Sequence, residues 1–160
     1  MNGTDGGGRI EVRPIGRVVG GRAETVDDAW DTVAATIELD SAVLEPGATA
    51  GLDDFSHVEV VFCFDRVDGA QVCRGSRHPR GRTDWPAVGI LAQRAKDRPN
   101  RIGVTVCRLT GVGPYRIDVT GLDAVDGTPV LDVKPYLAEF GPRGEVRQPR
   151  WTTELMAEYW

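Results

Sequence analysis

Apolar residues alternate with other residues along much of this 160-residue chain, and a period of two is the pattern of a β-strand with one face against a core. The clearest example is residues 57–64, where Val58, Val60, Phe62 and Phe64 share one face. The pattern predicts strands at residues 10–18, 31–39, 57–64, 87–93, 102–109, 115–122 and 130–133. Because turn residues separate these short segments, we expect a mostly β protein, a β-barrel or sandwich rather than a layered α/β sheet.

The length of the chain fits one domain with its own core. Residues 1–8 are polar and rich in glycine, so we expect them to be disordered. Residues 9–142 are expected to form this single β domain, a barrel or a sandwich, and residues 143–160 a tail whose short helix packs on it. That helix is expected at residues 151–160, with Thr152 or Thr153 as its N-cap. Residues 75–86 are interpreted as a long arginine-rich loop.

Several common sites are not expected. Residues 16–21 lack the glycine spacing of a dinucleotide-binding fingerprint, so the fold is not predicted to be a Rossmann fold. Cys63, Cys73 and Cys107 are widely spaced and contain no Cys-x-x-Cys pair, which argues against a metal site. The sequence shows no export signal and no apolar run of membrane-spanning length, and we therefore expect a cytoplasmic protein with no membrane association.

Charge is distributed unevenly along the chain, whose formal net charge is −5. Residues 1–72 hold five basic and fourteen acidic residues, residues 73–108 hold nine and two, and residues 109–160 hold five and eight. The basic block at residues 73–108 is nearly all arginine, which suits bidentate contacts with phosphate or carboxylate groups. Its presence predicts an anionic or nucleic-acid partner, and the alternative is a solvated surface loop.

Two further segments combine charged residues with residues that fix turn geometry. Residues 94–103 contain Arg98-Pro99-Asn100-Arg101, and residues 126–136 begin with Asp126-Gly127-Thr128-Pro129. Proline fixes φ, glycine accepts positive φ, and Asn and Asp tolerate turn conformations. We expect both segments to be shaped loops that meet when the sheet closes and line one binding pocket.

These segments carry a resemblance to a known family. The matching residues are Val88-Gly89-Ile90-Leu91-Ala92-Gln93-Arg94, Arg98-Pro99-Asn100-Arg101-Ile102-Gly103-Val104, Gly121 to Tyr136, and an earlier Phe55-Ser56-His57. In collinear order over residues 10–142 they resemble the TrmO family, also called TsaA-like proteins, in a short form without the C-terminal extension. The resemblance implies a homodimeric β-barrel that transfers a methyl group from S-adenosyl-L-methionine to threonylcarbamoyladenosine in tRNA.

The resemblance also implies where the methyl donor binds. The corresponding cofactor-binding residues are Asp65, Arg66, Arg94, Val104, Asp126, Gly127, Thr128 and Pro129. Since an arginine can hold a carboxylate or phosphate, the predicted substrate-binding residues are Arg98, Asn100, Arg80 and Arg82. Without the resemblance, the turn at Asp126 is interpreted as an ordinary hairpin turn and Arg98 as a surface charge.

Methyl transfer is an in-line displacement, so catalysis depends on orientation and on a base that removes the proton of the attacking amine. Candidate bases lie along one segment: Asp126, Asp132, Lys134 and Tyr136. The predicted catalytic residues are Asp126, Lys134 and Tyr136. Asp132 and Lys134 share one strand face and are alternatively a simple ion pair.

Two other functions fit the same sequence. One is a methyltransferase for a small metabolite that carries a carboxylate, because the arginine block serves that group as well as phosphate. The other is a non-catalytic barrel that binds single-stranded RNA through arginine and aromatic contacts. The possible stacking residues for that function are Trp85, Tyr115, Tyr136 and Trp151.

Overall fold

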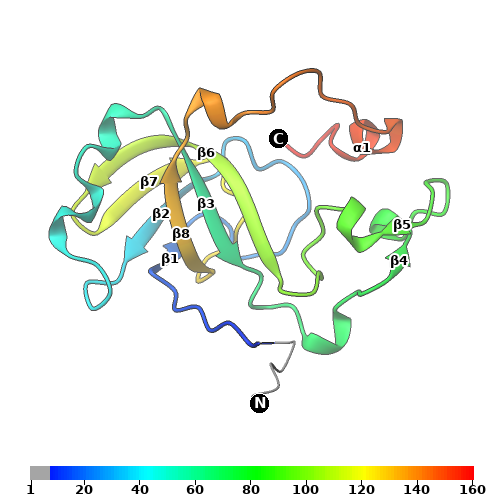
Figure 1. Ribbon diagram of the computed structural model, residues 1–160, viewed down its shortest axis with the longest axis horizontal. Helices are drawn as coiled ribbons and strands as arrows, with labels where there is room; N and C mark the ends of the chain where they lie inside the picture. The colour runs from blue at the N-terminus through cyan, green and yellow to red at the C-terminus, as the bar shows by residue number, and fades with distance from the viewer. Residues whose placement is uncertain (1–7) are drawn as a thin grey trace, which may run out of the picture.

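The computed structural model of the protein describes residues 8–160, and the predicted disorder of residues 1–8 lies outside this range except at Gly8. Six strands form a closed barrel in the order β1-β2-β7-β6-β3-β8. Figure 1 shows the barrel beside a smaller unit that contains the two-stranded sheet β4-β5. The strands are β1 (Gly16–Val19), β2 (Ala34–Leu39), β3 (His57–Cys63), β4 (Ser76–Arg77), β5 (Val88–Gly89), β6 (Ile102–Gly113), β7 (Arg116–Thr120) and β8 (Pro129–Pro135). The prediction of a mostly β barrel is therefore confirmed.

Helical structure within residues 8–160 consists of one α-helix and six single turns of 3-10 helix. The α-helix is α1 (Arg150–Leu155), and the 3-10 turns are η1 (Pro46–Thr49), η2 (Leu52–Asp54), η3 (Gly69–Gln71), η4 (Pro79–Gly81), η5 (Ile90–Ala92) and η6 (Ala138–Phe140). No helix within residues 8–160 is long and apolar enough to cross a membrane.

Strand β3 explains why the alternating pattern produces a barrel. Val58, Val60 and Phe62 are buried in the core, while the residues between them face outward. β3 pairs antiparallel with β6 on one side and β8 on the other, and β1 then joins β8 to β2. Closing the sheet pairs all six strands, so the barrel itself has no free edge. Burial in this core raises the pKa of the Cys107 thiol to about 12.

The observed strands differ from the predicted ones where apolar residues do not alternate toward the core. Ile10 and Val12 lie outside β1 and are exposed. Residues 87–93 form only the short β5 followed by η5, because Ile90 and Gln93 are buried at the three-residue spacing of a 3-10 turn while Leu91 is exposed. β6 continues through residues 110–113, past the predicted end of this strand at residue 109, with a bulge that begins at Leu109.

Residues 65–101 form an insert between β3 and β6. Arg77 makes two hydrogen bonds to the Asp97 carboxylate, and the side-chain amide of Gln93 donates to the carbonyl oxygens of Arg77 and Val88. Polar contacts therefore organise a segment with few apolar residues. The prediction of an unstructured loop at residues 75–86 was wrong in part, since these residues include β4 and η4.

The tail segment, residues 150–160, begins with α1 and then turns back to the barrel. The predicted helix was too long: α1 ends at Leu155 and has Pro149, not Thr152 or Thr153, at its N-cap. Beyond α1 the chain continues as turns, in which the N–H groups of Ala157 and Tyr159 donate to the carbonyls of Glu154 and Met156, three residues back. Glu158 and Tyr159 accept hydrogen bonds from the N–H groups of Ala29 (2.8 Å) and Trp30 (2.9 Å).

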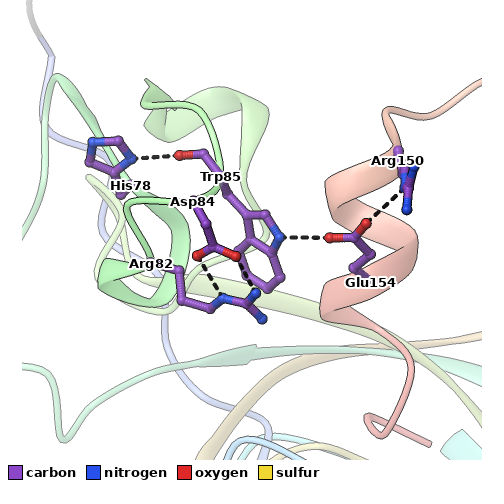
Figure 2. Close-up of polar contacts among 6 residues, drawn as sticks. All are labelled: His78, Arg82, Asp84, Trp85, Arg150 and Glu154. Carbon is purple, nitrogen blue, oxygen red and sulfur yellow. Dashed lines mark hydrogen bonds and ion pairs between the residues drawn. The ribbon is translucent and has the colours of Figure 1, made fainter.

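Helix α1 contacts the insert rather than the barrel. Figure 2 shows the indole N–H of Trp85 directed at Glu154, at a donor–acceptor distance of 2.9 Å. Arg82 stacks on the other side of the same indole, 3.9 Å from the ring centroid, and also binds Asp84. The Trp151 ring lies 6.3 Å from that of Trp85. A predicted packing of the helix on the barrel is thus replaced by packing on the insert.

Candidate functional site

The candidate site lies at the end of the barrel where β1 and β3 finish and β8 starts. Strands β1 and β3 both run antiparallel to β8, so the segments that follow them meet the segment that precedes β8. Residues 126–129, here called the Asp126 turn, are that preceding segment. The insert leaves β3 at this end and returns to β6 through the other turn-rich segment, residues 94–103 (Figure 1).

The Asp126 turn is fixed against the connection that follows β1. One Asp126 carboxylate oxygen accepts a hydrogen bond from Gly20 N–H (2.8 Å), and Asp126 N–H donates to the Arg22 carbonyl (2.7 Å). Gly127 N–H donates to the Val18 carbonyl, also at 2.8 Å. Gly127 has φ of +84°, a conformation that side chains other than glycine adopt only with strain. The turn is therefore a rigid feature with an exposed carboxylate.

Arg66 links the end of β3 to this turn. Its guanidinium donates to the carbonyl oxygens of Ala23 (2.9 Å) and Asp126 (2.8 Å). Asp65 and Arg66 are both exposed. The structure thus brings Asp65, Arg66 and the Asp126 turn together, although Arg66 is engaged by backbone oxygens.

Arg94 reaches β6 from the insert. It donates one hydrogen bond to the Val104 carbonyl (2.5 Å), and it makes no other within residues 8–160. Because Arg94 is exposed, its remaining N–H groups can donate hydrogen bonds to the carboxylate of a ligand. The Val104 side chain is half-buried, on the outward face of β6 with Ile102 and Val106.

The turn-rich segment at residues 94–103 reaches the same end of the barrel as the Asp126 turn. Phe64 N–H, just past β3, donates to the Arg101 carbonyl (2.8 Å), and the Arg101 guanidinium donates to the Val67 carbonyl (2.7 Å). Arg98 is half-buried and donates to the Gln93 carbonyl (2.8 Å), while Asn100 is exposed. The two predicted loops therefore meet through the segment that follows β3.

Arg80 and Arg82, predicted to bind substrate, are engaged within the protein. Arg80 binds both carboxylate oxygens of Asp28, at 3.2 and 2.7 Å, and these hydrogen bonds raise its pKa. Asp28 belongs to the β1–β2 connection, so this pair joins the insert to the site end of the barrel. Arg82 is held between Asp84 and Trp85 at the contact with α1 (Figure 2).

Lys134 and Tyr136, predicted to act with Asp126, lie at the other end of β8. Tyr136 N–H donates to the carbonyl of His57, the first residue of β3, whereas the Asp126 turn adjoins the last. The seven residues of β8 extend about 20 Å at the usual rise of a strand. The predicted catalytic cluster of Asp126, Lys134 and Tyr136 does not form within this chain. Lys134 instead pairs with Asp132, which raises the Lys134 pKa, as the ion-pair alternative expected.

The basic block is largely neutralised inside the protein. Arg77, Arg80, Arg82 and Arg108 form ion pairs, and Arg94, Arg98 and Arg101 donate to backbone carbonyls. Arg74 and Lys96 are exposed, and neither makes an ion pair among the described residues. The positive charge available to an outside anion is therefore smaller than the sequence suggests.

Sequence reasoning missed Asp123, Thr105 and Tyr159. Thr105 Oγ1 and the Tyr159 hydroxyl both donate to the Asp123 carboxylate, which lies three residues before Asp126. Asp123 lies within residues 121–136, which resemble the TrmO family, but nothing in the sequence indicated that the Tyr159 hydroxyl contacts its carboxylate.

Neither of the two surface hollows described for residues 8–160 joins the two loops. These open hollows of about 400 Å³ each flank β1. One is lined by Val19, Gly20, Ala34, Ala35, Thr36, Thr110, Arg116, Asp118 and Val119, and the other by Pro14, Gly16, Arg17, Glu38, Leu39, Asp40 and Ser41. Neither is lined by Arg94 or Asp126.

The exposed groups at this end fit the chemistry of S-adenosyl-L-methionine. Arg94 has free donors for the carboxylate of its amino-acid part, and the carboxylates of Asp65 and Asp126 can face its ammonium and sulfonium charges. A metal site lacks such support, since no cluster of three His, Cys, Asp or Glu side chains within residues 8–160 could hold an ion.

Comparison with known proteins gives consistent matches. The family model described as the tRNA-methyltransferase O N-terminal domain matches residues 27–141. A human tRNA (adenine(37)-N6)-methyltransferase is 38% identical over 99 residues, which cover 62% of this chain and 22% of the human protein. A probable S-adenosyl-L-methionine-binding protein of Methanothermobacter thermautotrophicus is 32% identical over 143 residues, covering 84% of this chain and 96% of that protein.

Solved structures agree with these matches. A TrmO crystal structure superposes with a TM-score of 0.72 and 30% identity, covering 88% of this chain and 63% of the TrmO chain. TrmO from Pseudomonas aeruginosa superposes with a TM-score of 0.69 and 30% identity, covering 87% and 61%. The chain thus spans less than a quarter of the human relative and about three fifths of the TrmO chains. The family model and the archaeal relative each match most of the sequence, and the chain belongs to the tRNA-methyltransferase O N-terminal domain family.

Proposed function

We propose that this chain is an S-adenosyl-L-methionine-dependent methyltransferase that methylates the exocyclic amine of an adenine in tRNA, with threonylcarbamoyladenosine as the acceptor. The observation that carries the proposal is the meeting of Arg66, Arg94 and the Asp126 turn at one barrel end, in a chain of this family. Relatives named as tRNA (adenine(37)-N6)-methyltransferases support methylation of an adenine in tRNA.

Each part of the methyl donor has a partner in this proposal. The free N–H groups of Arg94 bind the carboxylate, and the Asp126 turn offers backbone groups and a carboxylate at close range. Val104 supplies apolar contact. Arg66 acts mainly by holding the turn, because its guanidinium already donates to two carbonyl oxygens.

The bound donor supplies an electrophilic methyl group, and the residues of this chain orient the acceptor for attack in line with it. Arg98 and Asn100 lie on the segment that leads into β6 and are proposed to contact the acceptor. Asp126 is the one member of the predicted catalytic set at this end, so it is the proposed base that takes the amine proton. Lys134 and Tyr136 are not assigned a step.

The proposal includes a homodimer that works on tRNA in the cytoplasm. Ile102 and Val106 are 40% and 41% exposed on the outward face of β6, where β3 places Cys63 beside Ile102, Val61 beside Val104, and Glu59 beside Val106. Contiguous apolar side chains on a sheet surface are typical of a protein–protein interface. Exposed Arg74 and Lys96 are the basic residues left for contact with phosphate groups.

One observation favours the second candidate, methylation of a small carboxylate-bearing metabolite. Most of the arginine block is engaged by internal acids or carbonyls, and a small acceptor needs fewer free cations than tRNA does. A non-catalytic RNA-binding barrel has less support. Trp85 is only 4% exposed and is committed to Arg82 and Glu154, so it is not available for stacking on a base.

The test begins with calorimetry of the purified protein and S-adenosyl-L-methionine. We expect binding, and an Arg94→Ala variant should bind at least about tenfold more weakly with an unchanged melting temperature. Arg13→Ala, which removes an exposed arginine that pairs with Asp40 at the other end of β1, is the matched control and should bind normally. No heat of binding with the wild-type protein would refute the methyltransferase.

The acceptor is tested with isotope-labelled donor and tRNA from a strain that lacks the gene. We expect label in threonylcarbamoyladenosine after nucleoside digestion and mass spectrometry. Donor binding without any transfer to tRNA, together with unchanged modified adenosines in the deletion strain, would favour the small-metabolite reaction.

A further inference from the structure

The tail segment is bound to the end of the barrel that carries the candidate site. The proposed function assigns no role to any residue of the tail. Its backbone pairs with the β1–β2 connection through the N–H groups of Ala29 and Trp30, as described above. Trp30 is buried, and Arg22 stacks on its ring at 4.5 Å from the centroid. Arg22 is also the residue whose carbonyl accepts the N–H of Asp126. The tail therefore reaches the turn of the donor site through two residues, Trp30 and Arg22.

A half-buried hydroxyl network makes the second connection. The Tyr159 hydroxyl donates to one oxygen of the Asp123 carboxylate, and Thr105, which is 6% exposed, donates to the other. Burial raises the pKa of Tyr159, and the negative charge of Asp123 raises it further. Tyr159 therefore remains a protonated donor throughout the physiological pH range.

This network touches both halves of the proposed donor site. Asp123 lies in the β7–β8 connection, three residues before the Asp126 turn. Thr105 follows Val104, whose carbonyl holds Arg94. The positive charge of Arg94 is close enough to lower the Tyr159 pKa, against the effect of burial. Asp123 is thus the point where the turn, β6 and the tail are joined.

We propose that Tyr159 is a positioning residue of the methyl-donor site: acting through Asp123, it fixes the Asp126 turn against β6. This inference rests on the proposed function. Without the Tyr159 hydroxyl, Asp123 keeps one donor, Thr105, and is free to rotate toward solvent. The turn and Arg94 then lose their fixed separation, and a ligand that bridges them binds more weakly.

The hydroxyl is separable from the attachment of the tail. Tail and barrel remain joined by the two backbone hydrogen bonds, and α1 remains joined to the insert through Trp85 and Glu154. The Tyr159 ring also packs edge-on against Trp160, with centroids 4.9 Å apart. Tyr159→Phe keeps these contacts and removes a single oxygen atom.

The experiment compares Tyr159→Phe with Tyr115→Phe by calorimetry with S-adenosyl-L-methionine. Tyr115 lies in the β6–β7 turn at the other end of the barrel, so its variant controls for loss of a tyrosine hydroxyl. We expect the Kd of Tyr159→Phe to rise about tenfold, as for loss of a hydrogen bond to a charged group, and the control to match the wild type. In methyl-transfer kinetics, the KM for the donor should rise while the KM for the acceptor stays constant.

Equal donor affinity of Tyr159→Phe and wild type would overturn this inference and leave the proposed function intact, whereas failure of the wild type to bind the donor would overturn both. A parallel rise of both KM values with a lower melting temperature would show a purely structural role. If Tyr159→Phe does not fold, hydrogen exchange of the wild type decides. Saturating donor should slow exchange at Ala29 and Trp30, and slowing confined to Gly127 and Thr128 would refute the proposal.

Discussion

Gly103 on β6 occupies a position where the barrel interior has no room for a side chain. A Cβ atom there would lie 2.5 Å from two atoms of the Phe62 ring and 3.0 Å from the Phe64 ring. These rings pack edge to face, with centroids 5.2 Å apart. We predict that Gly103→Ala lowers the free energy of unfolding by about 1–3 kcal/mol, because the rings must leave their preferred packing. Urea denaturation followed by circular dichroism measures the change.

Gly89→Ala is the matched control for this prediction. A Cβ at Gly89 meets no atom within 4 Å, and its φ of −60° suits any residue. Its effect should stay within about 0.5 kcal/mol. Equal destabilisation by both substitutions would show that contact with the phenylalanine rings is not the cause.

At the residue scale, the sequence indicated which charged residues matter better than it indicated their partners. Arg80 was interpreted as a substrate contact, yet Asp28 binds it from 52 positions away. Arg66 was interpreted as a ligand contact, yet two backbone carbonyls hold its guanidinium. Such partners depend on how distant segments meet, which local patterns do not contain.

At the scale of elements, prediction succeeded where one physical requirement dominated. β3 alternates because one face is buried, so period two located it to within one residue. The insert and tail depend on side-chain contacts between segments, and their elements were misplaced. Glu158 and Tyr159, for example, pair through their backbone with the β1–β2 connection, and the helical pattern of the tail carries no trace of that contact.

Trp85 is the side chain that joins the insert to α1, since its ring contacts Arg82 and Trp151 and its N–H binds Glu154 (Figure 2). We predict that Trp85→Ala opens the insert and the tail while the barrel stays folded. Hydrogen exchange measured by mass spectrometry should become faster in residues 76–92 and 150–159 and stay slow in β3 and β6.

Trp160→Ala provides the control for this change, because Trp160 is half-exposed and makes no contact with Trp85 among those described. Exchange in the insert should be unaffected by it. Faster exchange throughout the barrel of Trp85→Ala would show that insert and barrel unfold as one unit.

At the scale of the whole molecule, the sequence predicted a barrel but not how it closes. Closure pairs β1 with β8, which are more than a hundred residues apart, and it places the β1–β2 connection beside the Asp126 turn. The candidate site is made by that closure. Its residues could be named from the segments that resemble the TrmO family. The separation of Lys134 and Tyr136 from Asp126 became clear only from the direction of β8 in the barrel.

The prediction for the whole molecule concerns its proposed homodimer, whose interface we place on the outward face of β6 and β3. If this face forms the proposed homodimer, a charge at Val106 must be buried without a partner, which costs several kcal/mol at an interface. Val106→Glu should therefore convert the wild-type dimer to a monomer in sedimentation-velocity ultracentrifugation. Val146→Glu, the same change at an exposed position, should remain dimeric.

A Val106→Glu protein that sediments as a dimer would place the interface on another face, and a monomeric wild type would remove the dimer from the proposal. Because Val104 lies between Ile102 and Val106 on this face, loss of the dimer should also weaken donor binding.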